Sequence, residues 1–491
     1  MRNLVFIISD QQRRDSMGCY GSRWAHTPNL DKLASSSYIF ENAYVTQAVC
    51  TPARASIMTG LYPHTAGPIV NKLPLDPNIP VLPEMMSKKY TTGYMGKWHL
   101  GNDIDKQHGF DKWISTEDDH RESYISKENK GKLSDYHKYL VSNGFTPDIE
   151  VAGDKIFSPD FRSKLPEQFQ MASFLSNQAN EFIVQNRSRP FVLYVSTFEP
   201  HSPYDGPYDN QYDPEEIPIG PAFLQKPHGA AKVNRLRSDY FMQYLEKGDI
   251  LDDPYLSKTL APGHDLSNLE GWLRLRAQYY GNVTLVDKMV GNIMKSIENA
   301  GIADDTAVVF TTEHGDMLGD HGMLEKRSFY EESSRIPLLM RIPWISSRET
   351  RIAGSMGQVD LVPTLLEILD QPLPGHLEGK SLVPVLNGKT NLKENDVFME
   401  WNGTSPDLPD RFLGSEEINT MLSFPYRSIV SERWKLNLSS KDQGELFNLD
   451  KDPFEQNNLF NSHEQKDRVQ VLKDKIHKWQ LDTGDTAPIP D

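Results

Sequence analysis

Cysteine is nearly absent from this sequence. Only Cys19 and Cys50 occur among 491 residues. Two cysteines cannot form the disulfide framework on which many small secreted domains depend. The fold must therefore rest on an apolar core. Cys19 lies in Gly18-Cys19-Tyr20-Gly21, where a role in small-residue packing is expected, whereas Cys50 belongs to a more specific motif.

Long apolar runs are also missing, and no stretch approaches the roughly 18 residues of a membrane helix. The run 4–8 is too short for the core of a signal peptide, and no small-residue cleavage site follows it. As it stands, the sequence predicts a cytoplasmic protein with no membrane partner. A leader removed beforehand would leave the same N-terminus and would imply a periplasmic or secreted protein.

Positive charge is in deficit. The 52 Lys and Arg residues face 68 Asp and Glu residues, which gives a net charge of -16. Nucleic acids and anionic membranes both require basic surfaces, so neither is an expected partner. Hydrophobic residues make up 38% and charged residues 24%, as in an ordinary folded protein. An anionic substrate would need a local cationic pocket within an acidic body.

Three continuous apolar runs, residues 4–8, 191–195 and 307–311, are typical of strands buried on both faces. Polar residues follow each run, and in open α/β sheets ligands bind beyond the carboxyl ends of the strands. We therefore expect an α/β fold with a large mixed, mainly parallel sheet flanked by helices. The polar groups delivered to its edge are Ser9-Asp10-Gln11, Glu199-Pro200-His201 and Glu313-His314-Gly315.

Helical spacing of apolar residues and helix-entry residues predict helices over 27–34, 272–300 and 360–369. The stretches 116–170 and 202–262 show no clear long period and are rich in polar residues. We expect both to be insertions over the sheet edge, where specificity usually resides.

A domain boundary is expected near Asn387-Gly388-Lys389. It would separate a catalytic domain, residues 1–388, from a smaller α+β subdomain, residues 389–491. Four short strand patterns and a final helical pattern predict an antiparallel sheet with one helix in this second part. These patterns cover residues 397–401, 426–430, 434–438, 445–449 and 464–483.

The most informative motif is Cys50-Thr51-Pro52-Ala53-Arg54, which continues to Thr59-Gly60. It resembles the signature of the type I sulfatases, which belong to the alkaline-phosphatase superfamily. In that family a formylglycine-generating enzyme oxidises the cysteine, and the hydrated aldehyde becomes the nucleophile that attacks sulfur. The resemblance implies an alkaline-phosphatase-like sheet, a catalytic residue at Cys50 and a polarising role for Arg54. The alternative is a buried cysteine beside a turn proline.

A cation site is expected at the ends of two predicted strands, at Asp10, Gln11, Glu313 and His314. An oxygen-rich set suits a hard divalent cation, Ca²⁺ before Mg²⁺ or Mn²⁺, whereas zinc would need more nitrogen or sulfur. The resemblance places the family's cation at these positions, with Cys50 in modified form beside it. Gln11 and Glu313 each stand where the family pattern has Asp.

Basic residues that could hold a sulfate ester occur in the order that the family shows. Gly96-Lys97-Trp98-His99 resembles its Gly-Lys-Trp-His motif, and Lys326 resembles its second lysine. Fixed cations aimed at developing charge lower a barrier more than they bind the ground state. We expect His201, helped by Lys326, to protonate the leaving alcohol and His99 to take a proton from the second hydroxyl of the nucleophile.

The leading hypothesis is a sulfatase that acts on a small sulfated saccharide bound by its end, because a charge of -16 would repel an extended sulfated polymer. The alternative is a phosphonate monoester or phosphodiester hydrolase of the same superfamily. Tyr204, Tyr208 and Tyr212 offer stacking faces and hydroxyl partners for a sugar, unless they only pack their loop. Arg13 and Arg14 are available to contact a further acidic group.

Overall fold

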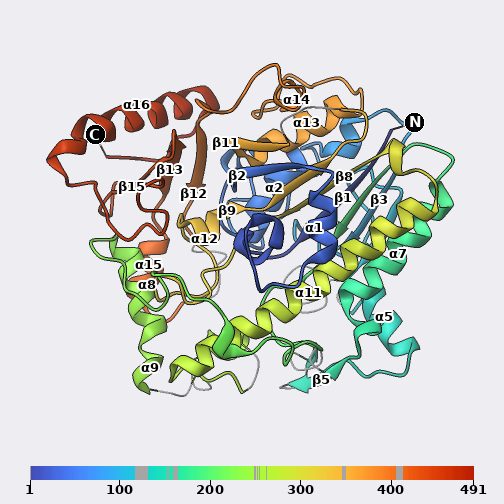
Figure 1. Cartoon of the computed structure of the whole chain (residues 1–491), viewed down its shortest axis with the longest axis horizontal. Helices are drawn as coiled ribbons and strands as arrows, with labels where there is room; N and C mark the ends of the chain where they lie inside the picture. The colour runs from blue at the N-terminus through green and yellow to red at the C-terminus, as the bar shows by residue number, and fades with distance from the viewer. Residues whose placement is uncertain are drawn as a thin grey trace.

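The computed structural model describes residues 2–116, 131–151, 154–158, 164–247, 250, 253, 255–260, 263–345, 350–404 and 413–490. Among these residues the chain forms a nine-stranded sheet, a separate four-stranded sheet and a two-stranded pair. Figure 1 shows the large sheet in the body of the molecule and the four-stranded sheet at the C-terminal end.

Three parallel strands form the centre of the large sheet. β1 (Asn3–Ser9) lies between β7 (Phe191–Ser196) and β8 (Thr306–Thr312), and pairs with both in parallel. Every residue of the three strands is buried. They contain the three apolar runs identified in the sequence. Because the strands are parallel neighbours, the polar residues that follow them reach the same edge of the sheet.

The outer strands make the sheet mixed but mainly parallel, as predicted. β3 and β4 extend it in parallel beyond β7. On the other side β10 runs antiparallel to β8 and to β2, and β11 pairs in parallel with β2. The bounds are β2 Tyr38–Tyr44, β3 Thr91–Gly96, β4 Lys112–Ser115, β9 Arg335–Ile336, β10 Leu338–Arg341 and β11 Arg351–Gly357.

Helices cover both faces of this sheet. Side chains alternate along a strand, so Val5 and Ile7 pack with one helical layer while Phe6 and Ile8 pack with the other. Each such buried side chain contributes about 1.5–3 kcal/mol. In Figure 1, α11 runs beside α7 in front of the sheet. The first layer comprises α1 (Pro28–Ala34), α7 (Met171–Asn186) and α11 (Leu269–Asn299), and the second α2 (Cys50–Thr59) and α13 (Leu361–Ile368).

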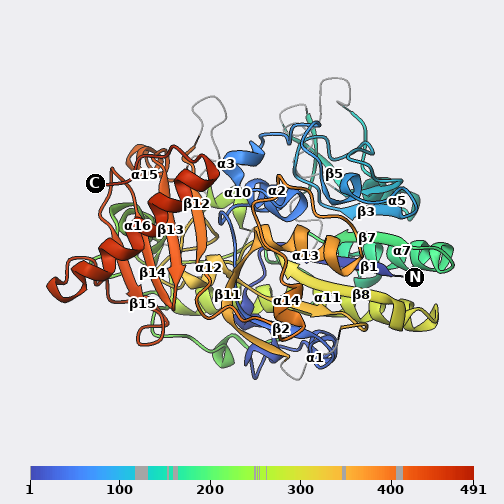
Figure 2. The ribbon, with the colours of Figure 1, turned by 90° about the horizontal axis from the view of Figure 1, so that it is seen from above.

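The C-terminal part is an antiparallel sheet with one helix, as the sequence predicts. Its strands follow the chain order β12, β13, β14, β15. Leu472, Ile476 and Trp479 of the helix α16 belong to a core shared with the sheet, and Figure 2 shows α16 lying across it. The boundary between residues 388 and 389 stays a prediction. The elements are β12 Val397–Trp401, β13 Tyr426–Ser431, β14 Trp434–Leu438, β15 Glu445–Asn448 and α16 Lys466–Thr483.

The two predicted insertions are only partly among the described residues. The described part of 116–170 holds α5 (Asp135–Ser142), β5 (Asp148–Val151) and β6 (Asp154–Phe157). In the second insertion, α8 (Lys232–Met242) packs against α15 (Glu416–Leu422) of the C-terminal part. That stretch therefore contacts the C-terminal part of the protein. None of the described helices is both long enough and apolar enough to cross a bilayer.

Candidate active site

Cys50 is the first residue of α2, a ten-residue helix in which every residue is buried. The backbone N–H of Thr51 donates to Asn71 Oδ1 at 3.1 Å, which satisfies one of the free donors of the first turn. Pro52 is tolerated there because the first turn of a helix needs no hydrogen bond from its N–H. The helix ends at Thr59 and is capped by Gly60, whose φ of 73° suits glycine. Cys50 thus lies at a helix N-terminus, where negative charge is favoured.

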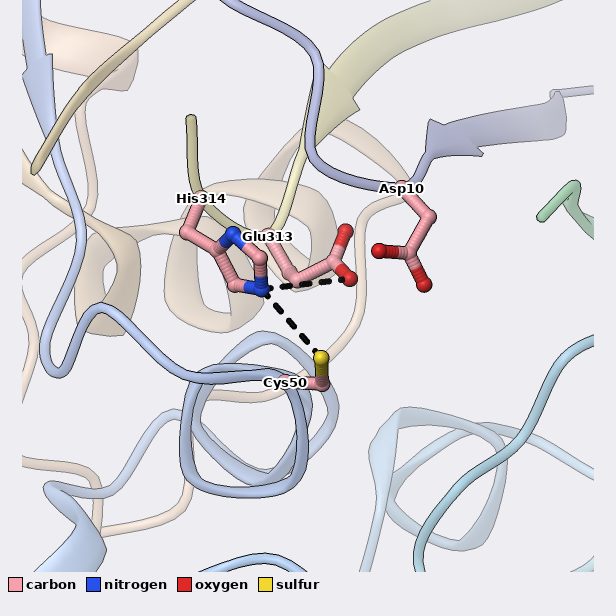
Figure 3. Close-up of side chains that lie close together, drawn as sticks. All are labelled: Asp10, Cys50, Glu313 and His314. Carbon is pink, nitrogen blue, oxygen red and sulfur yellow. Dashed lines mark hydrogen bonds and ion pairs between the residues drawn. The ribbon is translucent and has the colours of Figure 1, made fainter. Parts of the chain in front are cut away.

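Four polar side chains converge at this helix end. Asp10 follows β1, Glu313 and His314 follow β8, and one ligand atom of each, together with Cys50 Sγ, lies within 4.8 Å of the others. Figure 3 shows the four side chains pointing toward one another. His314 Nε2 lies 3.2 Å from Cys50 Sγ and 3.7 Å from Glu313 Oε1.

This group fits a divalent cation. His314 Nδ1 lies 2.9 Å from the carbonyl oxygen of Gly315, a contact that places the proton on Nδ1 and leaves Nε2 as a ligand. Asp10 Oδ1 is buried and has no hydrogen-bond partner among the described residues. Two carboxylates with one imidazole form an oxygen-rich donor set, which suits a hard cation better than zinc.

Gln11 lies beside this group and faces a different set of partners. Its backbone is in the left-handed region, with φ 65°, a conformation that persists only where its surroundings enforce it. Its Oε1 accepts a hydrogen bond of 2.5 Å from Lys326 Nζ, and its Nε2 donates to Asp316. Gln11 as a cation ligand stays a prediction.

Arg54 connects the helix α2 to the ends of the strands. Its Nη2 lies 3.1 Å from Asp10 Oδ2 and 3.2 Å from Glu313 Oε1. Its Nη1 donates to Ser196 Oγ and to the carbonyl oxygen of Lys97, both at 2.8 Å. The side chain is 2% exposed, so these contacts are shielded from water.

The Gly-Lys-Trp-His segment follows β3 and packs against the same helix. Lys97 Nζ lies 2.6 Å from Asp10 Oδ2 and 4.4 Å from the ring centre of Phe198. His99, with φ 60°, accepts a hydrogen bond from Thr51 Oγ1 at its carbonyl oxygen, 2.9 Å away. The predicted residues Arg54, Lys97 and His99 are thus connected through α2.

His201 and Lys326 form a pair. Lys326 Nζ lies 2.8 Å from His201 Nε2, and His201 Nδ1 donates to the carbonyl oxygen of Ser202 at 2.6 Å. Burial and the adjacent Lys326 ammonium hold the pKa of His201 well below its usual value. The imidazole is therefore neutral, and its Nε2 is the acceptor that faces Lys326 Nζ. Arg237 holds Lys326 in place by donating to its carbonyl oxygen at 2.5 Å.

The two buried carboxyl groups differ in their affinity for protons. Burial alone would raise the pKa of Asp10, but Lys97 and Arg54 outweigh burial and hold the pKa well below its usual value. Burial raises the pKa of Glu313 to about 8, despite the opposing charge of Arg54. Asp10 is therefore ionised at neutral pH, whereas Glu313 keeps its proton until a bound cation displaces it.

Three further residues complete the site. Asp316 follows Glu313-His314-Gly315 and accepts from Tyr204 Oη at 2.6 Å, and Ser196 ends β7 beside Arg54. Ser196 directly follows the apolar run 191–195, and Asp316 belongs to the polar segment that follows the run 307–311, a signal that could have identified both. Gln358 donates to the carbonyl oxygen of Glu313 at 2.8 Å and lies far away in sequence, without a local pattern to mark it.

Arg13 and Arg14 do not enlarge the cationic part of the site. Arg13 and Arg14 are committed to internal carboxylates, with Arg13 Nη1 2.7 Å from Asp320 Oδ2 and Arg14 Nη2 2.5 Å from Glu41 Oε2. They do not offer a free cation to a further acidic group.

The tyrosines of the second insertion mainly pack their loop. Tyr204 is fully buried, and Tyr212 is 7% exposed with its hydroxyl 2.8 Å from Thr284 Oγ1. The hydroxyl of Tyr208 donates a hydrogen bond to Glu167 Oε2 and accepts one from Lys288 Nζ. Stacking of a sugar on Tyr204 or Tyr212 is therefore excluded by their burial, and the packing alternative holds for both.

Comparison with known families agrees with this geometry. A family model described as Sulfatase matches residues 2–371. The chain belongs to the sulfatase family. It is an enzyme, a sulfuric ester hydrolase. A second model, described as N-sulphoglucosamine sulphohydrolase, C-terminal, matches residues 319–482 of this sulfatase.

Relatives of this sulfatase cover nearly its whole length. An arylsulfatase of Clostridium perfringens is 28% identical, over 96% of this chain and 92% of its own. An N-acetylglucosamine-6-O-sulfatase of Bacteroides thetaiotaomicron is 26% identical, over 99% of this chain and 87% of its own. In fold, the chain is similar to a phosphonate monoester hydrolase of Agrobacterium radiobacter, with a TM-score of 0.75, 22% identity and coverage of 98% and 96%.

We predict that the affinity for a divalent cation depends on pH through Glu313. Because burial raises the pKa of this carboxyl to about 8, a cation that binds below that pH must displace a proton. The affinity for Ca²⁺ should rise by up to about tenfold per pH unit until it levels off above the pKa. Calorimetric titration of Cys50→Ala protein, in buffers of different ionisation enthalpy, measures affinity and proton release together.

The matched control for this titration is Glu313→Gln in the same Cys50→Ala background. It removes the titrating proton, so its weaker affinity should be flat between about pH 6 and 8. Equal affinities across that range in the parent protein, with no proton released, would contradict the assigned role of Glu313.

Proposed function

We propose that this sulfatase removes sulfate from a small sulfated saccharide bound by its end, with a nucleophile made from Cys50. The observation that carries the proposal is the position of Cys50 at the N-terminus of α2, with its Sγ within 4.8 Å of ligand atoms of Asp10, Glu313 and His314. A nucleophile at this position faces groups that can bind a cation and stabilise negative charge.

Two additions supply chemistry that the side chains lack. Oxidation of Cys50 to formylglycine, by a formylglycine-generating enzyme, would provide a hydrated aldehyde as nucleophile. A divalent cation, Ca²⁺ before Mg²⁺ or Mn²⁺, would act as a Lewis acid there. Asp10, Glu313 and His314 are the residues that would hold it, with Gln11 as a further oxygen donor.

The basic residues stabilise charge that develops on the sulfate oxygens. Arg54 and Lys97 both contact Asp10, so their positions are set before substrate binds. Such preorganised cations cost no reorganisation during the reaction. The carbonyl oxygen of His99 accepts a hydrogen bond from Thr51, which places this residue beside α2. We assign to His99 the role of the base that removes the proton from the second hydroxyl of the nucleophile.

Lys326 and His201 together deliver a proton to the leaving alcohol. The neutral imidazole cannot donate from Nε2 by itself, because that nitrogen accepts from Lys326 Nζ. The ammonium of Lys326 is therefore the source of the proton, passed directly or through His201 Nε2. This refines the expectation from sequence, in which His201 was the acid and Lys326 its helper.

A sulfated sugar is the substrate class that the relatives and the charge favour. One relative is named as an N-acetylglucosamine-6-O-sulfatase, and its similarity covers 99% of this chain. The net charge of -16 disfavours an extended polyanion along the surface. Arg13 and Arg14, which lie near the site in sequence, are paired with internal acids and do not extend the cationic region.

Substitution of the nucleophile tests the mechanism. Cys50→Ala should abolish sulfate release from 4-nitrophenyl sulfate while leaving circular dichroism unchanged, because alanine provides no nucleophile. Cys19→Ala is the matched control and should retain activity, since Cys19 lies outside the site. Retention of more than a few per cent of activity by Cys50→Ala would refute the mechanism. Mass spectrometry of the peptide that holds residue 50 should show formylglycine in the active enzyme.

The alternative is a phosphonate monoester or phosphodiester hydrolase, and a protein of similar fold is named as a phosphonate monoester hydrolase. Sulfate and phosphonate monoesters both carry one negative charge, but the phosphonate has a carbon substituent where the sulfate has a third nonbridging oxygen, so one site discriminates between them by shape and hydrogen bonding. We expect kcat/KM for 4-nitrophenyl sulfate to exceed that for 4-nitrophenyl phenylphosphonate in the same preparation. The reverse order would favour the alternative, with the cation and nucleophile roles unchanged.

End binding predicts how sulfate release depends on chain length. At equal concentrations of sulfate groups, sulfated oligosaccharides should be hydrolysed faster than the polymer from which they come, because only chain ends can enter the site. Sulfate release and polymer length can be followed together by ion chromatography and size-exclusion chromatography. Faster release from the intact polymer, with loss of sulfate along its length, would rule out an end-binding site.

A further inference from the structure

A lysine of the smaller sheet is fully buried and contacts the segment that follows Lys326. Lys435 belongs to β14, and its side chain is 0% exposed. Its Nζ lies 2.8 Å from Glu331 Oε1 and 2.9 Å from Glu455 Oε1, and it donates to the carbonyl oxygen of Phe329 at 2.5 Å. A buried ammonium needs such partners to compensate for the loss of water. Lys435 therefore joins three separate segments of the chain at one point.

The charges of this cluster are paired. Burial alone would raise the pKa of Glu331, but Lys435 and two arginines hold that pKa at about 2. Burial raises the pKa of Glu455 to about 7, although Lys435 opposes the shift. Burial would lower the pKa of Lys435, but the two carboxyl groups raise it above its usual value. Lys435 is therefore charged at neutral pH, and Glu331 is its ionised partner.

The first segment that Lys435 holds carries the proton donor of the proposed reaction. Phe329 is three residues after Lys326. Arg327, beside Lys326, has a φ of 71°, a backbone conformation that surrounding contacts must enforce in a residue other than glycine. Arg237 supports this loop at the carbonyl oxygens of Lys326 and Arg327. Lys435 supports the same loop at Phe329, from the opposite side of the chain order.

The second segment held by this lysine is the short helix α12 (Glu331–Ser334), which Figure 1 shows between the large sheet and the four-stranded sheet. The carbonyl oxygen of Ser333 accepts a hydrogen bond from the backbone N–H of Gly315 at 2.9 Å. Gly315 directly follows His314, and a Cβ added to Gly315 would lie only 2.0 Å from the carbonyl oxygen of Glu332. The helix is thus in direct contact with the loop that carries the candidate cation ligands.

Glu455, which follows β15 in the chain, completes the cluster. Its Oε2 accepts a hydrogen bond from the backbone N–H of Glu331 at 2.6 Å, while its Oε1 contacts Lys435. The first N–H groups of a helix have no partner within the helix, so Glu455 satisfies one of these donors in α12. The C-terminal part of the chain therefore fixes the start of α12 twice, through a lysine and through a carboxyl group.

We propose that Lys435 is a positioning residue for the reaction, because it holds the Lys326 loop and, through α12, the His314 loop in their mutual arrangement. It acts only through the carbonyl oxygen of Phe329 and the carboxyl groups of Glu331 and Glu455. The inference rests on the proposed function for the roles of Lys326 and His314. It gives the smaller sheet a part in the chemistry without a reacting group of its own.

The dependence of the rate on the leaving group tests this role. Lys435→Met keeps an unbranched side chain of similar length and removes the charge, so the Lys326 loop should shift. Weaker proton donation slows the release of a poor leaving group more than that of a good one. We expect kcat/KM for phenyl sulfate to fall about tenfold more than kcat/KM for 4-nitrophenyl sulfate, since small displacements of a reacting group carry large rate costs. A purely structural role would lower both values equally, because only the amount of folded enzyme would change.

Lys475→Met is the matched control. Lys475 lies on α16 of the same C-terminal part, and its Nζ lies 2.9 Å from Asp396 Oδ1 and from Ser431 Oγ, which are both outside the two active-site loops. This variant should keep the wild-type ratio of the two rates.

Glu455→Gln is a second variant that decides the question if Lys435→Met fails to fold. It keeps the size of the side chain and an oxygen for the N–H of Glu331, but removes one negative charge beside Lys435. The ratio should shift in the same direction by a smaller factor, because Glu331 and Phe329 still hold the ammonium.

Hydrogen exchange locates the change without any substrate. The backbone N–H groups of Gly315 and Val45 donate to the carbonyl oxygens of Ser333 and Ser334 in α12, so they report on the attachment of this helix. Lys435→Met should speed exchange in peptides that cover these two amides and residues 326–330, while exchange in α7 stays at the wild-type rate. Lys475→Met should leave all of these peptides unchanged.

A wild-type ratio of the two rates in both Lys435→Met and Glu455→Gln would overturn the positioning role. Faster exchange confined to residues 397–482, with wild-type rates in the two active-site loops, would overturn it as well. Absence of turnover of both sulfate esters by the wild-type enzyme would instead contradict the proposed function. In that case the exchange experiment alone decides whether Lys435 holds the two loops.

Discussion

The buried guanidinium of Arg54 is the interaction on which the site depends. It contacts Asp10 after β1, Glu313 after β8, Ser196 at the end of β7 and the carbonyl oxygen that follows β3. Removing one partner of a buried ion pair typically costs about 3–5 kcal/mol, because the other charge is left without compensation. Arg54 therefore holds the helix that carries Cys50 against the ends of four strands.

This arrangement also explains the unequal protonation of the two carboxyl groups. Asp10 has both Arg54 and Lys97 within contact distance, whereas Glu313 shares Arg54 with it and lies near Asp10 itself. Two carboxylates in a dry site repel each other, so one keeps its proton unless a further positive charge is present. A divalent cation is such a charge, and the same geometry that raises the pKa of Glu313 prepares the group to bind one.

The two sheets contribute differently to the site because they differ in strand direction and burial. The large sheet is parallel at its centre and buried on both faces, so it delivers reactive groups to one rigid edge. The smaller antiparallel sheet has one face packed on α16 and reaches the approach to Cys50 through β12.

The sequence by itself determined the central strands and the site residues that follow them. Apolar runs such as 4–8 are local signals, and parallel neighbours necessarily bring Asp10, Glu313 and His314 to one edge. Only the tertiary structure decided the rest. The partner of Glu313 at Gln358 and the inward orientation of Tyr204 depend on contacts between distant segments. Such contacts leave no periodic pattern in the chain, because each depends on where separate elements pack in space.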